Sequence, residues 1–262
     1  MTADAPRVLT DVDARGVATL TLARPERHNA FDGDLIAALH AALTDLAARP
    51  IHLLLLRAQG RSFCAGADLD DMDAMARAAP EQNLAAALAL ARTLQALDEF
   101  PAPTLACVQG NAYGGGVGLV ACCDIALCSE RAKFALTEVR LGLVPATISP
   151  HVVAAIGARQ ARRYFQTAES FDASTAHRIG LVHEVVSEAE FDDRIAALVD
   201  SLLAGGPAAQ REAKQLIREV DGRPPDDALR QATSHRLARL RASREGQDGV
   251  AAFLEKRPPY WR

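Results

Sequence analysis

Three short stretches of the chain have the hydrophobic pattern of β-strands. Residues Val17–Leu22 alternate between apolar side chains and threonine, the two-residue period of a half-buried strand, and Arg24-Pro25 then interrupts the pattern. Residues 51–56 and 104–108 are instead almost continuously apolar and lie between turn signals, as expected for strands that are covered on both faces. These two stretches predict inner strands of a mostly parallel sheet.

Helical periodicity separates these strands. After Asp32, which is placed to cap a helix, apolar side chains recur every three or four residues until Pro50, at Leu35, Ile36, Leu39, Leu43 and Leu46. Residues 81–100 are rich in alanine and leucine, which favour helices, and they lie between the two continuous apolar runs. The order strand, helix, strand predicts an α/β fold.

The pattern changes after the glycine and proline residues at 205–207. Two helix-forming stretches, 208–220 and 226–244, replace the strand signals there. We therefore divide the chain into an α/β core, residues 1–204, and a C-terminal helical segment, residues 205–262. The arginines of this segment are interpreted as a solvated face, although appended helices are also common oligomer contacts.

Composition and charge narrow the class of partner. The formal net charge of −4 and the absence of a nucleic-acid-binding motif argue against nucleic acid, and no apolar run is long enough to span a membrane. The N-terminal residues 1–10 lack the pattern of a signal peptide, so we expect a cytoplasmic protein. The odd number of cysteines favours reduced thiols: Cys64, Cys107, Cys122, Cys123 and Cys128. A small-molecule partner is expected.

Two glycine-rich loops carry the candidate chemistry. Residues 61–69 and 109–118 each follow a predicted strand and lead toward a helix. Unpaired backbone N–H groups at two such junctions can converge on one developing negative charge, which is an oxyanion hole. A single glycine-rich turn is more often only a tight connection, but two favour function. A nucleotide site is disfavoured because neither the G-x-G-x-x-G nor the P-loop spacing is present.

These loops and three further segments resemble the enoyl-CoA hydratase/isomerase (crotonase) family. The matching segments, in family order, are residues 63–69, 110–116, 123–126, 133–138 and 141–142, and the ends of the chain, at Arg24-Pro25, Asn29-Ala30 and 253–257, are also similar. The resemblance implies an α/β fold in which β-β-α units form a spiral, followed by C-terminal helices. It also implies a homotrimer or homohexamer, with the C-terminal segment forming the oligomer.

The resemblance assigns roles to individual residues. It places the two oxyanion N–H groups on Cys64 and Gly115, where only the backbone matters, and a catalytic cysteine would need a nearby base that the sequence does not show. Glu138 is the expected general acid or base, provided that burial raises its pKa. Substrate contacts are expected at Arg24, Asn29, Ala30, Ala65, Gly66, Ala67, Asp68, Gly114 and Gly118.

Gly118 is the main departure from the family pattern. Hydratases of the family normally carry a first glutamate at this position, and glycine can neither hold nor activate a water molecule. The run 139–150 nevertheless resembles the methylglutaconyl-CoA hydratase-like subgroup, whose members often lack this glutamate. In that subgroup, Arg140 or His151 could meet a substrate carboxylate, although both could equally be surface residues.

Three functions follow from these observations. The leading hypothesis is an enoyl-CoA hydratase that adds water reversibly to a 2-enoyl-CoA, with branched and carboxylated acyl groups among the candidate substrates. The alternatives are a Δ3,Δ2-enoyl-CoA isomerase that uses Glu138 alone, and a non-catalytic acyl-CoA-binding protein. The scattered histidines and cysteines give no metal-ligand spacing. We therefore expect no metal and no cofactor apart from the coenzyme A of the substrate.

Overall fold

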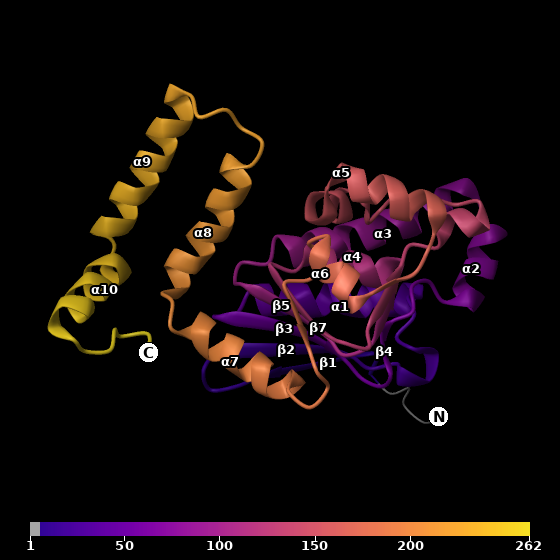
Figure 1. The fold of residues 1–262 in the computed structure, drawn as a ribbon, viewed down its shortest axis with the longest axis horizontal. Coiled ribbons are helices and arrows are strands. Elements are labelled where there is room, and N and C mark those ends of the chain that lie inside the picture. The colour runs from indigo at the N-terminus through magenta and orange to yellow at the C-terminus, as the bar shows by residue number, and fades with distance from the viewer. Residues whose placement is uncertain (1–5) are drawn as a thin grey trace.

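The protein is built around two β-sheets (Figure 1), described here for residues 6–262 of a computed structural model. The N-terminal residues 1–5, part of the stretch tested above for a signal peptide, lie outside the described residues. The larger sheet has the order β1 (Val8–Val12), β2 (Val17–Leu22), β3 (Leu53–Ala58), β5 (Thr104–Val108), β7 (Ile125–Ser129) and β10 (Glu184–Val186). Only β1 runs antiparallel to its neighbour, so the prediction of a mostly parallel sheet is confirmed.

A smaller second sheet lies beside the glycine-rich loops. Its order is β4 (Ser62–Cys64), β6 (Asn111–Tyr113), β8 (Lys133–Ala135) and β9 (Phe171–Asp172). Each of the consecutive pairs β3–β4, β5–β6 and β7–β8 contributes one strand to each sheet. This repetition is the spiral of two-strand units that the resemblance implies.

Helices cover both faces of the larger sheet. The helix α1 (Gly33–Ala47) begins where the Asp32 carboxylate accepts a hydrogen bond from the Leu35 N–H, and it buries four of the five apolar residues of the predicted stripe. On the same side lie α2 (Leu69–Ala76), α3 (Pro80–Asp98), α4 (Gly115–Cys122), α5 (Ser149–Thr167) and α6 (Ala173–Arg178), whereas α7 (Phe191–Leu203) packs on the opposite face. One close-packed apolar core therefore lies on each face of the larger sheet and fixes its position relative to the helices.

The C-terminal helices form an arm that projects from this core (Figure 1). It comprises α8 (Pro207–Val220), α9 (Asp227–Ala242) and α10 (Arg244–Glu255). The sequence predicts one helix across 226–244, but Ser243 is extended and its hydroxyl accepts a hydrogen bond from the Gly246 N–H, so a new helix starts there.

A buried carboxylate holds the arm together. Glu245 of α10 accepts hydrogen bonds from the N–H groups of Ala208 and Ala209 at the start of α8, at 3.0 and 2.7 Å. A negative charge at a helix N-terminus is favourable. Among residues 6–262, no helix combines the length and the apolar character needed to cross a membrane.

Candidate active site

A cavity of about 420 Å³ lies where the two glycine-rich loops meet. Its lining comes from Phe31 and α1, from the loop before α2, from α2 and α3, from the start of α4 and from the segment 137–148. Apolar side chains dominate the wall, among them Ile36, Met72, Met75, Leu90, Leu143 and Ile148. Of the residues predicted to act in the site, the cavity is lined by Ala65, Gly66, Ala67, Gly114, Gly115 and Glu138.

The two loops touch through glycine backbones. Gly66 and Gly114 both have positive φ angles, +89° and +48°. A Cβ atom placed on Gly66 would lie 3.2 Å from the Tyr113 carbonyl oxygen, and one placed on Gly114 would lie 3.7 Å from the Gly66 Cα. Glycine is required here both by backbone conformation and by this close approach.

Two residues that line the cavity have backbone N–H groups without an acceptor in the described chain. Phe31 bridges the first loop: its N–H donates to the Gly66 carbonyl and its own carbonyl accepts from the Asp68 N–H, both at 2.7 Å. The intervening Ala67 N–H has no acceptor within residues 6–262, and the same holds for the Gly115 N–H at the first position of α4. Both residues line the cavity.

Cys64 lies elsewhere. It is the last residue of β4, it is fully buried, and it does not line the cavity. Its carbonyl and side chain pack against Gly116, where an added Cβ would stand 2.7 Å from the Cys64 oxygen. Burial raises the pKa of its thiol to about 12, so the thiol is protonated at neutral pH and is no nucleophile.

Glu138 is the carboxylate of the cavity. It opens a short 3₁₀ helix (Glu138–Leu141) and is half-buried beside the start of α4. Burial raises the pKa of this carboxyl above its ordinary value. Its buried Oε2 has no hydrogen-bond partner within the described chain, as expected of a group that is held ready for a ligand.

Gly118 faces a side chain and not an open site. The buried Ile148 covers it, and a Cβ placed on Gly118 would lie only 2.9 Å from the Ile148 Cβ. The sequence gives no signal for a role of Ile148, because nothing along the chain indicates that two residues 30 positions apart share one volume.

The remaining predicted substrate contacts form an ionic cluster below the loop. Arg24 pairs with Asp32 at 2.6 Å and with the buried Asp68 at 3.4 Å, and it donates to the Ala30 carbonyl. The fully buried Asn29 accepts from the Arg24 N–H and donates to the carbonyls of Gln59 and Ser62. These groups are paired within the protein and support the loop, and their contact with a substrate stays a prediction.

Neither candidate partner for a substrate carboxylate reaches the cavity. Arg140 is exposed and outside the lining, and His151 lies 3.9 Å from the Asp98 carboxylate. The ionisable side chains in the described lining are Asp71 and Glu138, both acidic. The described lining therefore offers no cation that could pair with an anionic group of a ligand.

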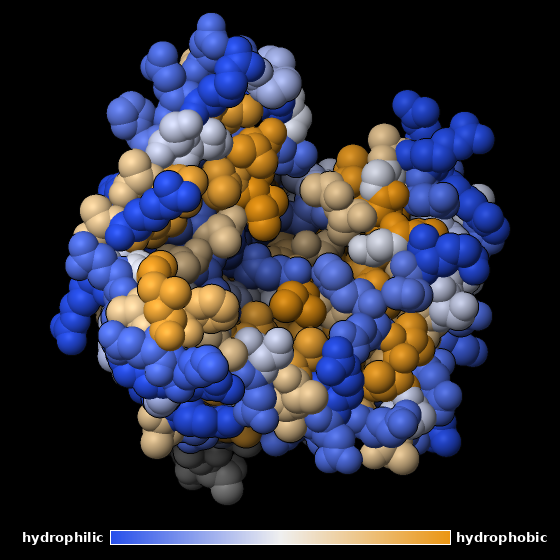
Figure 2. All heavy atoms as spheres, turned by 60° about the vertical axis from the view of Figure 1, so that its left-hand side comes forward, coloured by the Kyte–Doolittle hydropathy of each residue, from blue (hydrophilic) through white to orange (hydrophobic). Residues whose placement is uncertain are grey.

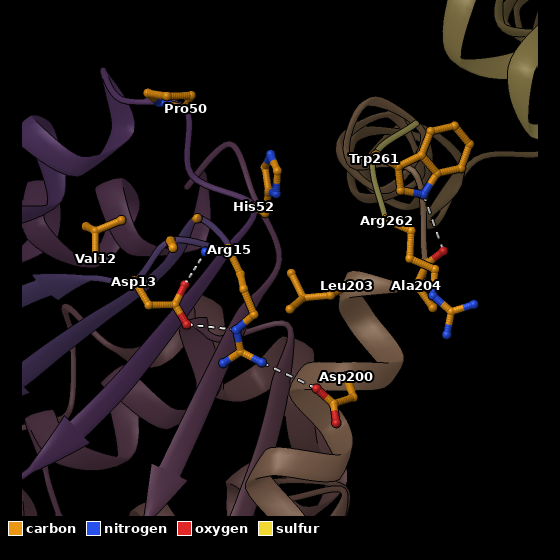
Figure 3. A pocket seen from close by; sticks show the side chains of 12 residues that line it. Val12, Asp13, Arg15, Pro50, His52, Asp200, Leu203, Ala204, Trp261 and Arg262 are labelled. Atoms are coloured by element: carbon orange, nitrogen blue, oxygen red, sulfur yellow. Dashed lines mark hydrogen bonds and ion pairs between the residues drawn. The ribbon is translucent and has the colours of Figure 1, made fainter. Parts of the chain in front are cut away.

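A larger cavity, of about 840 Å³, lies between the β1–β2 turn, the end of α7 and the C-terminus (Figure 3). Within it, Arg15 contacts both Asp13 and Asp200, and the Trp261 indole N–H donates to the Ala204 carbonyl at 3.4 Å. It contains neither a glycine-rich loop nor an unpaired buried carboxylate among its described residues. We therefore take the smaller cavity as the active site.

Comparison with known proteins shows the family of this chain. The sequence profile of the enoyl-CoA hydratase/isomerase family matches residues 13–262. The crystal structure of an enoyl-CoA hydratase from Shewanella pealeana is 42% identical with a TM-score of 0.94, covering 97% of this chain and 96% of that one. An enoyl-CoA hydratase from Mycobacterium smegmatis is 33% identical with a TM-score of 0.92, covering 98% and 99%.

The chain therefore belongs to the enoyl-CoA hydratase/isomerase, or crotonase, family. Family membership alone leaves the reaction open. A 4-chlorobenzoyl coenzyme A dehalogenase from an Arthrobacter species is 31% identical over 87% of this chain and 82% of its own length. The particular reaction must therefore be argued from the residues of the site.

Proposed function

We propose that the protein is an enoyl-CoA hydratase that adds water reversibly to 2-enoyl-CoA thioesters. The observation that carries this proposal is the position of Glu138, a half-buried carboxylate with an unpaired oxygen, in the cavity that also receives two free N–H groups. The proposal has three parts: the oxyanion hole, the proton transfers and the acyl group.

The oxyanion hole is formed by the N–H groups of Ala67 and Gly115. Both residues line the cavity and neither N–H has an acceptor in the described chain, whereas Cys64 lies behind the wall. In the reaction, the thioester oxygen gains negative charge as the enolate forms, and two preorganised donors stabilise it more than the ground state. Gly115 keeps the role expected from the sequence, and Ala67 takes the role first given to Cys64.

Glu138 serves both proton transfers. Its carboxylate accepts a proton from water while the water oxygen bonds to C3 of the acyl chain, and the C2–C3 double-bond electrons move toward the thioester oxygen. The carboxylic acid so formed then returns this proton to C2, which restores the carboxylate. One carboxyl group suffices because the proton taken from water is the proton that the enolate needs.

The acyl group is proposed to be uncharged. A methylglutaconyl-like substrate carries a second carboxylate, which would lie in a cavity whose described lining offers no cation and two acidic side chains. An unpaired buried charge is costly, and a like charge adds repulsion. Coenzyme A enters as part of the substrate, and the chemistry requires no other cofactor.

A Δ3,Δ2-enoyl-CoA isomerase is the second candidate, favoured by one observation. Ile148 fills the space over Gly118, so no second carboxylate can be placed there. An isomerase needs only one, because Glu138 can take a proton from C2 of a 3-enoyl-CoA and return it to C4.

Labelled water separates these reactions. The purified protein and its Glu138→Gln variant are incubated with 2-enoyl- and 3-enoyl-CoA esters in oxygen-18 water, and products are followed by mass spectrometry. Gain of one labelled water that is lost in the variant supports the hydratase. A shifted double bond without a change in mass supports the isomerase. If no ester is turned over, the result supports the hypothesis of a non-catalytic acyl-CoA-binding protein.

We also propose that the arm mediates self-association into a trimer or a dimer of trimers. It exposes several large apolar side chains: Ile217, Val220, Leu237, Val250, Phe253 and Leu254. In Figure 2, hydrophobic side chains also gather around a hollow on this side of the molecule. Light scattering on the wild type and on a Phe253→Ser, Leu254→Ser variant tests the proposal, which requires a larger species in the wild type and its dissociation in the variant.

A further inference from the structure

Ile148 fills the volume that a side chain at residue 118 would occupy. It caps the start of α5, it is only 2% exposed, and it lies directly on α4. A Cβ atom on Gly118 would stand 2.9 Å from the Ile148 Cβ, nearer still to its Cγ2, and 3.5 Å from Leu94 Cδ2. Any side chain at residue 118 would therefore compete with Ile148 for the same space.

This volume lies beside the path of the acyl chain. Gly118 follows Gly115 by three residues, a rise of about 4.5 Å along α4. In the proposed function, the Gly115 N–H marks the position of the thioester oxygen. Ile148, which lies against Gly118, forms part of the wall of the same cavity. Ile148 is therefore part of the wall that an acyl chain in this cavity would meet.

We propose that Ile148 is a specificity-determining residue that sets the length and branching of the acyl chains that the cavity accepts. The inference rests on the proposed function in assuming an acyl-CoA ligand whose thioester oxygen meets the Gly115 N–H, and it holds for either reaction. Because Ile148 is fixed between α4 and α5, an acyl chain that needs its volume would have to overpack the wall, which close-packed interiors resist. Gly118 completes the arrangement, since only glycine leaves Ile148 room.

Binding affinity tests the inference without relying on turnover. Dissociation constants are measured by calorimetry for straight-chain and branched saturated acyl-CoA esters of increasing length, for the wild type and for Ile148→Ala. We expect the preferred chain to become longer, and the affinity of chains that exceed the wild-type optimum to rise about tenfold or more relative to that optimum.

A matched control separates specificity from general loosening. Ile156 is also a buried isoleucine of α5, but it lies outside the cavity lining. Ile156→Ala makes the same truncation on the same helix and is expected to leave the chain-length profile unchanged. A profile that shifts equally in both alanine variants would assign Ile148 a merely structural role.

Two milder variants keep the inference testable if Ile148→Ala does not fold. Ile148→Val enlarges the cavity, and Gly118→Ala pushes Ile148 toward it, so the preferred chain length must move in opposite directions. Unchanged profiles in folded variants that bind acyl-CoA would overturn the inference alone. Failure of the wild type to bind any acyl-CoA would instead overturn the proposed function.

Discussion

The Glu138 side chain lies against the backbone of Gly114. A Cβ atom placed on Gly114 would stand 3.1 Å from Glu138 Oε1 and 3.8 Å from its carboxyl carbon. The glycine that allows the two loops to meet therefore also defines where the carboxylate sits. This contact links the oxyanion donors to the proposed acid–base group.

Gly114→Ala tests this link. The methyl group would displace the Glu138 carboxylate, and the positive φ of residue 114 would add strain of about 1–3 kcal/mol to the folded state. Misplacing a catalytic group by about 1 Å can cost about a hundredfold in rate, so we expect a loss of kcat/KM of that order. Steady-state kinetics and thermal unfolding measure the two effects.

Gly222→Ala is the control for Gly114→Ala. Gly222 also has a positive φ, +67°, but an added Cβ would meet nothing within 4 Å. It should lower the melting temperature and leave kcat/KM intact. An equal loss of activity in both variants would show that strain alone, and not the contact with Glu138, explains the effect.

The raised pKa of Glu138 predicts the pH dependence of activity. As a base toward water, Glu138 must be ionised, and burial raises its pKa above the ordinary value of 4.5. We therefore expect kcat/KM to fall as the pH drops through an apparent pKa that lies above 4.5. A pH profile of kcat/KM checks this, and an acid limb at or below 4.5 would contradict it.

The same pKa shift predicts the pH dependence of stability. Because the folded-state pKa exceeds that of the unfolded chain, the unfolded state loses its proton first as the pH rises. Ionisation of Glu138 therefore lowers the free energy of unfolding at neutral pH. This destabilisation disappears at a pH below the ordinary pKa of the carboxyl, where Glu138 is protonated in both states. Glu138→Gln should raise the melting temperature at pH 7 more than at pH 5. Glu130→Gln, at an exposed position, should not reproduce this difference.

Much of the framework was predictable because it depends on local pattern. The alternation in β2 and the leucine stripe of α1 are visible over a few residues, and both elements form as expected. The strands of the smaller sheet are only two or three residues long, too short to show a period. Their existence depends on pairing between segments that are distant in the sequence.

The site shows the same division. Glu138 lines the cavity, as expected from its motif. The Ala67 N–H is left without an acceptor because Phe31 pairs with Gly66 and Asp68 on either side of it. No pattern along the chain reveals this pairing. The family resemblance predicts a substrate contact for Arg24, and no pattern along the chain shows that Arg24 also pairs with Asp32 and Asp68.

A structural role for Arg24 gives the next prediction. Its side chain is 12% exposed, and its loss would leave the carboxylates of Asp32 and Asp68 short of a partner. Removing one member of a buried ionic cluster costs about 3–5 kcal/mol, so Arg24→Ala should lower the free energy of unfolding by about 3 kcal/mol. Urea unfolding measures this change.

The exposed Arg27 is the matched control for Arg24. It also pairs with Asp68, but its side chain is 48% exposed. Arg27→Ala should lower the free energy of unfolding much less than Arg24→Ala does, because solvent screens an exposed ion pair. If Arg24→Ala strongly raised KM for acyl-CoA and left the free energy of unfolding unchanged, the result would instead support the direct substrate contact expected from the sequence.

Glu245 offers a test of the C-terminal arm as a structural unit. Its buried carboxylate accepts two N–H hydrogen bonds at the start of α8, and the helix dipole favours its charge. Glu245→Gln keeps the shape of the side chain but removes the charge and replaces one acceptor oxygen with a donor. We expect a loss of about 1–3 kcal/mol within the arm. Hydrogen exchange should accelerate over residues 205–255 and remain unchanged in α1 and β3. The exposed Glu255, which pairs with Arg257, provides the control, and its glutamine variant should leave hydrogen exchange in α8 unaltered.

Uniform acceleration of hydrogen exchange across the whole chain in Glu245→Gln would instead show that the core and the arm unfold together. That outcome would contradict the division of the chain between residues 204 and 205.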